Sequence, residues 1–188
     1  MISKRIVYTR HDGGISVCCP SEEIFQVMQM GGYWNDRPRG FVQAQIDRQI
    51  ADGIKPSHAV RFAHAVAFGG VTEAGAWGII KDRDCERHGY NFDLFRVDDI
   101  PRDRWFRNAW SRSPNGGPIA IALEKARPIQ WQRIVAAAKS KNSEREFEFN
   151  LDFSPINLDT LSLKSAIRHA RDEHELRAVW PDELRRTA

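Results

Sequence analysis

The sequence predicts an α+β fold with an antiparallel sheet built on an N-terminal hairpin, a helical insertion and a C-terminal strand–helix unit. Three observations support this fold class. Two β-rich runs flank an Asp-Gly turn near the start, glycines punctuate helical repeats across residues 21–81, and residues 147–153 alternate strictly between apolar and polar side chains. Asp-Gly between β-rich runs signals a tight hairpin, and a period of two indicates a strand with one buried face.

Composition and charge are those of an ordinary globular protein. Of the 188 residues, 41% are hydrophobic and 28% are charged, and the formal net charge is +3. Such proportions argue against wholesale disorder. The weak positive charge permits contact with nucleic acid or with an acidic protein surface, but a dedicated nucleic-acid-binding domain usually concentrates more charge on one face. Nucleic acid is therefore not the expected partner.

Cysteine content and hydropathy bear on the cellular compartment. The three cysteines are an odd number, and Cys18 and Cys19 are adjacent, which favours reduced thiols in the cytoplasm over a disulfide framework. No apolar run in the sequence approaches the roughly 18 residues of a membrane-spanning helix. We therefore expect a cytoplasmic protein that does not enter a membrane.

The first predicted element is the hairpin, with strands at residues 5–8 and 15–18. The helical insertion over about residues 21–81 follows it. Its helices are expected to begin near these residues: Ser21, Phe41, Ser57 and Thr72. Serine and threonine side chains cap the free N–H groups at helix starts, and glycine suits the residue that ends a helix. Glycine stops imply short connections and hence helices folded back on each other.

The middle of the chain combines charge with turn residues. Residues 82–88 form a charge cluster that we interpret as a solvated loop. A strand is expected at residues 92–97. The Pro- and Gly-rich turn at residues 113–118 leads into a short strand at residues 119–122.

The C-terminal part begins with a helix predicted at residues 125–139, which has apolar side chains on one face. The polar run at residues 139–146 is the expected linker, and the alternating strand at residues 147–153 follows it. Further helical segments are predicted at residues 161–170 and 176–180, the last one stopped by a proline.

These elements predict a main domain over residues 1–140 and a C-terminal subdomain over residues 141–188. The subdomain is equally compatible with being part of the same domain. A chain of this length buries roughly 70% of its unfolded surface when it forms a single core.

Catalytic signatures are missing from the sequence. It contains no phosphate loop, dinucleotide fingerprint, paired-histidine metalloprotease helix or nucleophile elbow. We therefore expect no enzyme activity, no cofactor and no metal. The spacing of Cys85 and His88, with Asp82 and Asp84 nearby, resembles half of a zinc site, but structural zinc sites normally have two such pairs. A nucleophilic Cys85–His88 pair is the remaining enzymatic alternative, and it would need a thiol of low pKa.

The segment at residues 101–112 is rich in large rings and arginines, and we expect it to form a helix with Phe106 and Trp110 on one face. The candidate interface residues are Arg102, Arg104, Trp105, Phe106, Arg107 and Trp110. Guanidinium groups beside tryptophan faces can bind phosphate and stack bases. The rings can instead fill the core under arginine stems, which the residue types favour. They can also be buried against a partner chain, because Trp and Arg are enriched in interface hot spots.

Short islands of the sequence resemble a group of small proteins encoded in tailed phages and prophages of proteobacteria, commonly near tail genes. The islands lie at residues 8–17, 99–101, 106–110, 125–127 and 176–181. None of them is a catalytic motif, so the resemblance implies a position near tail genes but no biochemical mechanism. The resembled proteins have a long charged helix after the residues that match 125–127, where this sequence predicts a strand.

The resemblance implies a non-enzymatic phage tail-region protein, which is either a virion component linking tail and fibre or a fibre-assembly factor. Its expected partners are other tail or fibre proteins, with a second copy of the chain as a further option. Its expected location is the host cytoplasm during assembly and then the virion. The alternative is a nucleic-acid-binding or regulatory phage protein, in which Arg102, Arg104, Arg107 and Arg112 would contact phosphates and binding would weaken steeply with salt.

Overall fold

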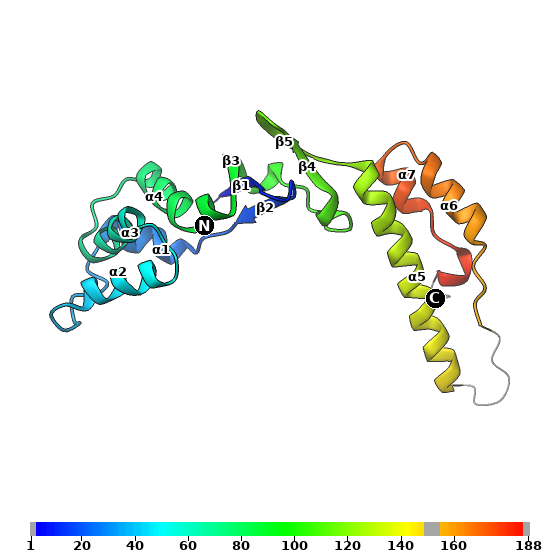
Figure 1. Cartoon of the computed structure of the whole chain (residues 1–188), viewed down its shortest axis with the longest axis horizontal. Coiled ribbons are helices and arrows are strands. Elements are labelled where there is room, and N and C mark those ends of the chain that lie inside the picture. Colours follow the sequence, from blue (N-terminus) through cyan, green and yellow to red (C-terminus); the bar gives the residue numbers. More distant parts are fainter. Residues whose placement is uncertain (1–2, 149–154, 186–188) are drawn as a thin grey trace. The chain divides into compact units, whose positions relative to one another are not determined.

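The computed structural model describes residues 3–148 and 155–185 and shows a mixed α+β fold, as predicted (Figure 1). The chain divides into two compact units. Unit 1 comprises Met1–Arg102 and Arg112–Ile119, and unit 2 comprises Asp103–Ser111 and Ala120–Ala188. None of the helices in the described ranges is both long enough and apolar enough to span a membrane.

A three-stranded antiparallel sheet forms one part of unit 1. Its strands are β1 (Lys4–Arg10), β2 (Ile15–Cys18) and β3 (Gly89–Arg96), in the order β2-β1-β3. The turn between β1 and β2 is closed by Asp12, whose Oδ1 accepts a hydrogen bond from the Gly14 N–H at 2.8 Å. This confirms the predicted N-terminal hairpin, and β3 confirms the strand expected near residues 92–97.

Four helices lie between β2 and β3 in unit 1 (Figure 1). They are α1 (Glu22–Met30), α2 (Phe41–Ala51), α3 (Pro56–Phe68) and α4 (Glu73–Ile80). Ser21 Oγ accepts from the Ile24 N–H, and Thr72 Oγ1 accepts from the Gly75 N–H. These local hydrogen bonds explain why the two caps could be found in the sequence. All four predicted helices are confirmed, but the predicted cap at Ser57 is wrong: α3 begins at Pro56, and its N-cap residue Lys55 makes no capping hydrogen bond from its side chain.

The core of unit 1 joins the sheet to the helices. Ile6 from β1, Met28 from α1, Val66 from α3 and Ile80 from α4 belong to one buried cluster. Burial of side chains of this size supplies the main stabilising free energy, at roughly 1.5–3 kcal/mol each. The helical insertion is therefore part of the unit 1 core.

The charge cluster after α4 is helical, so the predicted solvated loop is wrong. Lys81–Cys85 form a π-helical turn and Glu86–His88 a 3-10 turn. Asp82 accepts a hydrogen bond from Arg61 at 2.7 Å, and Arg83 pairs with Asp84. Because these charges find partners at the surface, the helix continues and turns Cys85 inward, where it is fully buried.

A second hairpin consists of β4 (Trp110–Ser113) and β5 (Gly116–Ile121). The predicted turn lies at its tip, and the strand expected at residues 119–122 starts earlier, at Gly116. The boundaries between the two units fall within these strands, after Ser111 and after Ile119.

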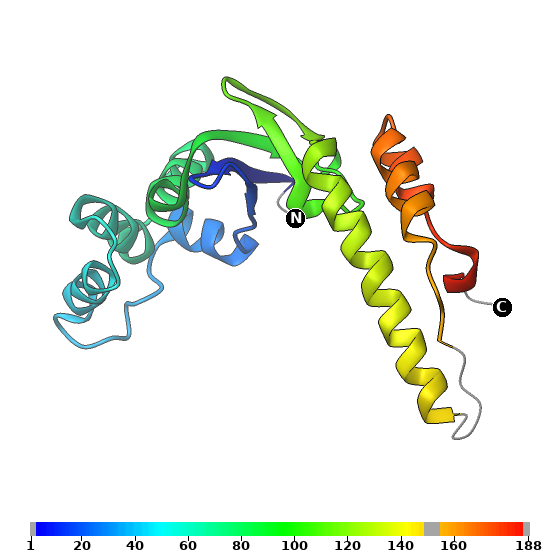
Figure 2. The same ribbon diagram turned by 45° about the vertical axis from the view of Figure 1, so that its right-hand side comes forward.

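Unit 2 is mainly helical. Its long helix α5 (Leu123–Glu148) lies beside α6 (Thr160–His169) and α7 (Glu173–Ala178), and a 3-10 turn (Asp182–Leu184) follows (Figure 2). Buried side chains from these elements, among them Ile134, Ile167 and Leu176, form one cluster with Phe106. The two predicted C-terminal helices are confirmed.

Helix α5 is longer than the helix expected at residues 125–139. The predicted linker at residues 139–146 is helical, and so are residues 147 and 148 of the predicted strand. The rest of that strand lies outside the described residues. The predicted domain boundary at residue 140 falls inside α5. The strand that was expected to set this chain apart from the resembled proteins is therefore replaced by helix as far as residue 148.

The helix predicted at residues 101–112 is wrong. Two 3-10 turns, Val97–Asp99 and Arg107–Ala109, flank an irregular stretch that leads into β4. Asp103 Oδ1 accepts a hydrogen bond from the Trp105 N–H at 2.8 Å. Such a local side-chain bond competes with helical hydrogen bonding.

Candidate functional site

Trp105, one of the predicted interface residues, is enclosed by other side chains of unit 2. Its Nε1–H donates to Gln130 Oε1 at 2.8 Å, and its ring lies edge-on to Trp180 with 5.8 Å between ring centroids. The guanidinium carbons of Arg133 and Arg177 lie 4.4 and 4.8 Å from its centroid. Trp105 is therefore half-buried between two cations and a second indole.

Phe106 and Trp110 are core residues. They are 2% and 1% exposed, and the Arg104 guanidinium carbon lies 5.0 Å from the centroid of the Trp110 ring. The rings are inside and the guanidinium is outside, which is the core-packing arrangement considered for this segment. Arg102, Arg104 and Arg107 are exposed, and a role for them at an interface stays a prediction.

Arg112, which the nucleic-acid alternative would use, is not available to a phosphate. Its side chain is 0% exposed and forms an ion pair with Asp93. It also donates to the main-chain oxygens of Val7 at 3.2 Å, Asn91 at 3.0 Å and Gly117 at 2.9 Å. All four partners belong to unit 1, so Arg112 fastens the second hairpin to the three-stranded sheet.

Cys85 and His88 do not form a catalytic pair. Cys85 is fully buried, whereas His88 is exposed and accepts a hydrogen bond from Arg87 Nε at 2.9 Å. A hydrogen bond to Cys18, together with burial, raises the pKa of the Cys85 thiol, while the same bond lowers the pKa of Cys18. A buried thiol of raised pKa is a weak nucleophile.

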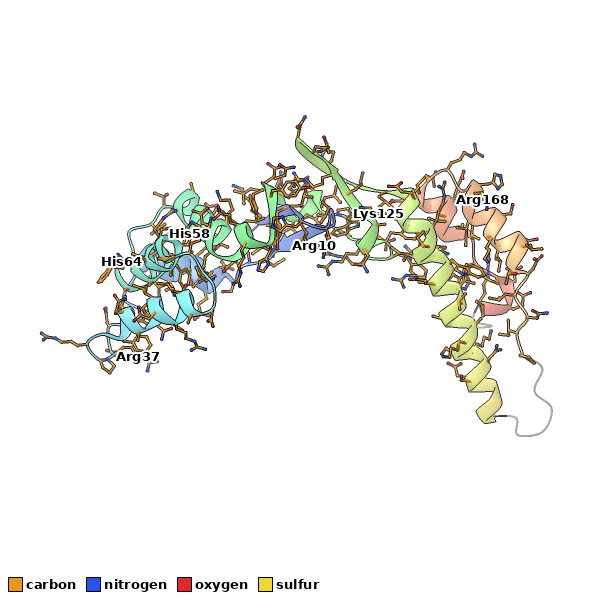
Figure 3. All side chains as sticks on the ribbon, viewed as in Figure 1. Arg10, Arg37, His58, His64, Lys125 and Arg168 are labelled. Atoms are coloured by element: carbon orange, nitrogen blue, oxygen red, sulfur yellow. The ribbon has the colours of Figure 1, made fainter. Side chains whose placement is uncertain are left out.

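Metal ligands do not gather in the described part of the chain. Within residues 3–148 and 155–185, no group of three or more His, Cys, Asp or Glu side chains is placed to hold an ion. His58 and His64 both lie on α3 (Figure 3), but His58 faces Glu86 at 3.4 Å and the His64 ring packs edge-on against Phe68.

A cleft in unit 1 brings together charged and aromatic residues that the sequence does not group. We call it the arginine cleft; its volume is about 350 Å³. It is lined by Trp34, Gln45, Arg48, Gln49, Asp52, Ile54, Phe62, Arg83 and Arg87. The lining holds three guanidinium groups and one carboxylate, so it carries an excess of positive charge.

The three arginines of the cleft differ in their partners. Arg83 donates from Nε and Nη2 to the Asp84 carboxylate at 2.6 and 2.7 Å, and its guanidinium carbon lies 3.5 Å from the centroid of Phe62. Arg87 Nη1 donates to the Asp52 main-chain oxygen at 2.9 Å. Arg48 is exposed and makes no ion pair or hydrogen bond from its side chain to any described residue.

An apolar tip forms where α1 and α3 end. Met30 and Phe68, which define this tip, are 82% and 73% exposed. The two helix ends exchange main-chain hydrogen bonds, from the Gly32 N–H to Ala67 O and from the Gly70 N–H to Gln29 O, each 2.8 Å long.

Glycines allow this close approach of the two helix ends. Gly31 and Gly69 have φ values of 71° and 70°, which residues other than glycine rarely adopt. A Cβ atom on Gly31 would also collide with the main chain of Phe68, and one on Gly69 with that of Met30. The Gly-Gly pairs mark helix ends in the sequence, but nothing local indicates that the two ends meet.

Comparisons of the chain with protein-family models, with curated proteins and with solved structures found no match in any of the three.

Proposed function

We propose that the chain is a non-enzymatic protein of a phage tail region, either a virion component that links tail and fibre or a fibre-assembly factor. The resemblance of its sequence islands to proteins encoded near tail genes supports the phage context. The structural observation that carries the proposal is the apolar tip of Met30 and Phe68. The partner in this proposal is another tail or fibre protein, met in the host cytoplasm during assembly and retained in the virion.

The apolar tip has two properties of a docking site. Scattered exposed hydrophobic residues are normal on protein surfaces. Met30 and Phe68, however, belong to two chain segments that lie side by side in space, and most of the surface of each side chain is exposed to water. The reciprocal hydrogen bonds between the helix ends hold both backbones in place. A preorganised apolar contact loses less conformational entropy on binding than a flexible one.

The test uses the phage or prophage that encodes the chain. Mass spectrometry of purified particles should find the polypeptide, or deletion of its gene should yield particles with missing or misassembled fibres. A chain with Met30→Ser and Phe68→Ser together should keep its circular dichroism and melting temperature, because both side chains are exposed. It should nevertheless lose incorporation or fibre assembly by at least tenfold.

The matched control is Leu161→Ser in unit 2, which removes an apolar side chain that is 82% exposed. It should behave like the wild type. Normal incorporation of the Met30/Phe68 variant would exclude the apolar tip as the docking surface. Particles that lack the polypeptide, together with normal fibres after gene deletion, would refute the tail-region function itself.

A further inference from the structure

We propose that the arginine cleft binds a single unpaired nucleotide unit, a ligand that combines a phosphate group with a planar base. This site goes beyond the proposed tail-region function and uses none of the residues of the apolar tip. Two kinds of molecule present a phosphate together with a planar base in this way: a free nucleotide and one nucleotide of a single-stranded nucleic acid. The experiment below distinguishes between them.

The charge of the cleft suits a phosphate. Arg48 offers all its guanidinium N–H groups, because no described side chain or main-chain oxygen accepts from it. Arg87 uses Nε and Nη1 for His88 and Asp52, which leaves its Nη2 group. Guanidinium groups bind phosphate oxygens in a bidentate way, and such charge-assisted bonds are about twice as strong as neutral ones.

The aromatic side chains of the cleft suit a base. Trp34 is half-buried, and its ring is held edge-on by Phe41 at 5.6 Å between centroids. Phe62 is buried and is covered by the Arg83 guanidinium, which itself offers a flat cationic surface. Bases stack on indole and guanidinium planes with little dependence on sequence. Gln45, also in the lining, adds an amide that can hydrogen-bond a base edge.

The size of the cleft limits the ligand. Its volume of about 350 Å³ lies near the lower end of the range for small-molecule sites, roughly 300–1,000 Å³. This space suits one nucleotide better than a dinucleotide cofactor. A nucleic acid would therefore bind through one splayed nucleotide, without reading several bases.

The walls of the cleft are tied together without a ligand. The turn between α2 and α3 is held to the 3-10 turn at Glu86–His88 by the bond from Arg87 to Asp52. Lys55 and Glu86 add an ion pair at 3.0 Å across the same two segments. A preformed site avoids part of the entropy cost of binding. Arg37, in the loop before α2, places its guanidinium carbon 5.5 Å from the centroid of the Phe41 ring and is not part of the lining.

The experiment is calorimetric titration of the full chain with AMP, GMP, CMP, UMP, inorganic phosphate and an eight-nucleotide poly-dT strand at low salt. At least one mononucleotide should bind with a Kd below about 1 mM. Arg48→Gln and Trp34→Leu should each weaken that binding by about tenfold or more. Arg96→Gln, which removes an exposed arginine of unit 1 outside the cleft, should change it less than twofold.

The comparison between probes decides the ligand source. Binding of poly-dT much tighter than any mononucleotide, with a steep salt dependence and loss in Arg48→Gln, would support a nucleic acid as the source. Tighter mononucleotide binding supports a free nucleotide. Phosphate binding as tightly as the nucleotides, no binding of any probe, or unchanged binding in a folded Arg48→Gln variant would overturn the proposal. Arg48 is exposed, so this variant keeps the test valid if Trp34→Leu does not fold.

Discussion

Arg112 in unit 1 is a buried charged side chain, whereas Gln130 in unit 2 is a buried neutral one. Both are 0% exposed. Arg112 joins the second hairpin to the sheet, and Gln130 joins α5 to Trp105 and, at 2.8 Å, to the Val179 main-chain oxygen. Each side chain therefore connects segments that are distant in the sequence, but the consequences of removing it differ.

The difference between the two residues is one of desolvation. The hydrogen bonds to carboxylate and carbonyl partners offset the free energy that a guanidinium loses when it leaves water. Replacing the guanidinium therefore leaves several of these partners unpaired. A buried amide loses less water on folding and is satisfied by two or three hydrogen bonds. Unit 1 should therefore lose more stability when Arg112 is replaced than unit 2 loses when Gln130 is replaced.

The largest expected effect comes from Arg112→Met, which removes the ion pair with Asp93 and the bonds to three main-chain oxygens. We expect the free energy of unfolding to fall by about 3 kcal/mol. Larger losses occur when both partners of a broken ion pair are buried, but Asp93 is half exposed. Urea denaturation measures it. Arg112→Lys should recover part of the loss, and a variant as stable as the wild type would contradict this role of Arg112.

The next effect is that of Gln130→Leu, which leaves the Trp105 Nε1–H and the Val179 oxygen without their partner. We expect a loss of about 1–3 kcal/mol. Combining it with Trp105→Phe should cost less than the sum of the two single changes, because the second change removes the unpaired donor. Denaturation of the wild type, the two single variants and the double variant completes a double-mutant cycle. Strict additivity of the two changes in unfolding free energy would show that the hydrogen bond contributes nothing.

A smaller effect is expected from acid, and it should concern unit 1. Burial disfavours the charge of Asp82, but hydrogen bonds from Lys81 and Arg61 outweigh this and lower its pKa. Because the folded-state pKa is below the unfolded one, this stability is present above pH about 4 and is lost as the pH falls through the folded pKa.

The contribution of Asp82 should be at most about 1 kcal/mol. Melting curves between pH 7 and pH 3 test the prediction, since Asp82→Asn should flatten that part of the pH dependence. Asp82→Asn melting with the same pH dependence as the wild type would disprove it.

The smallest perturbation is thiol alkylation, which reports on unit 1 alone because all three cysteines lie in it. Exposed Cys19 should react with iodoacetamide first and buried Cys85 last, slower by about two orders of magnitude or more. Peptide mass spectrometry follows each site. Arg112→Met should speed the reaction of Cys85, and Gln130→Leu should leave it unchanged if the units open separately. Equal rates at Cys19 and Cys85 would contradict the burial of Cys85.

Patterns that act over a few residues were predicted well from the sequence. The hairpin depends on Asp12 and the turn around it, and the helices at residues 22–30 and 73–80 depend on caps three residues away. The failures have the opposite cause. Apolar and cationic spacing at residues 101–112 suggested a helix, but the Asp103 bond to the Trp105 N–H and the burial of Phe106 and Trp110 impose another path.

The candidate sites illustrate the same limit. The sequence drew attention to the rings of Trp105, Phe106 and Trp110, and the structure places the last two in the core. The arginine cleft has no sequence signature, because tertiary packing brings together Trp34 from the loop before α2, Arg48 from α2 and Arg87 from the 3-10 turn after Cys85.

The sequence by itself determined the α+β class, the first hairpin and the helix starts, because caps, glycine stops and apolar periodicity act through neighbouring residues. Tertiary structure alone decided the roles of Arg112 and Gln130, the exposed tip of Met30 and Phe68, and the arginine cleft. The physical reason is that burial and desolvation depend on partners brought close only by the complete fold.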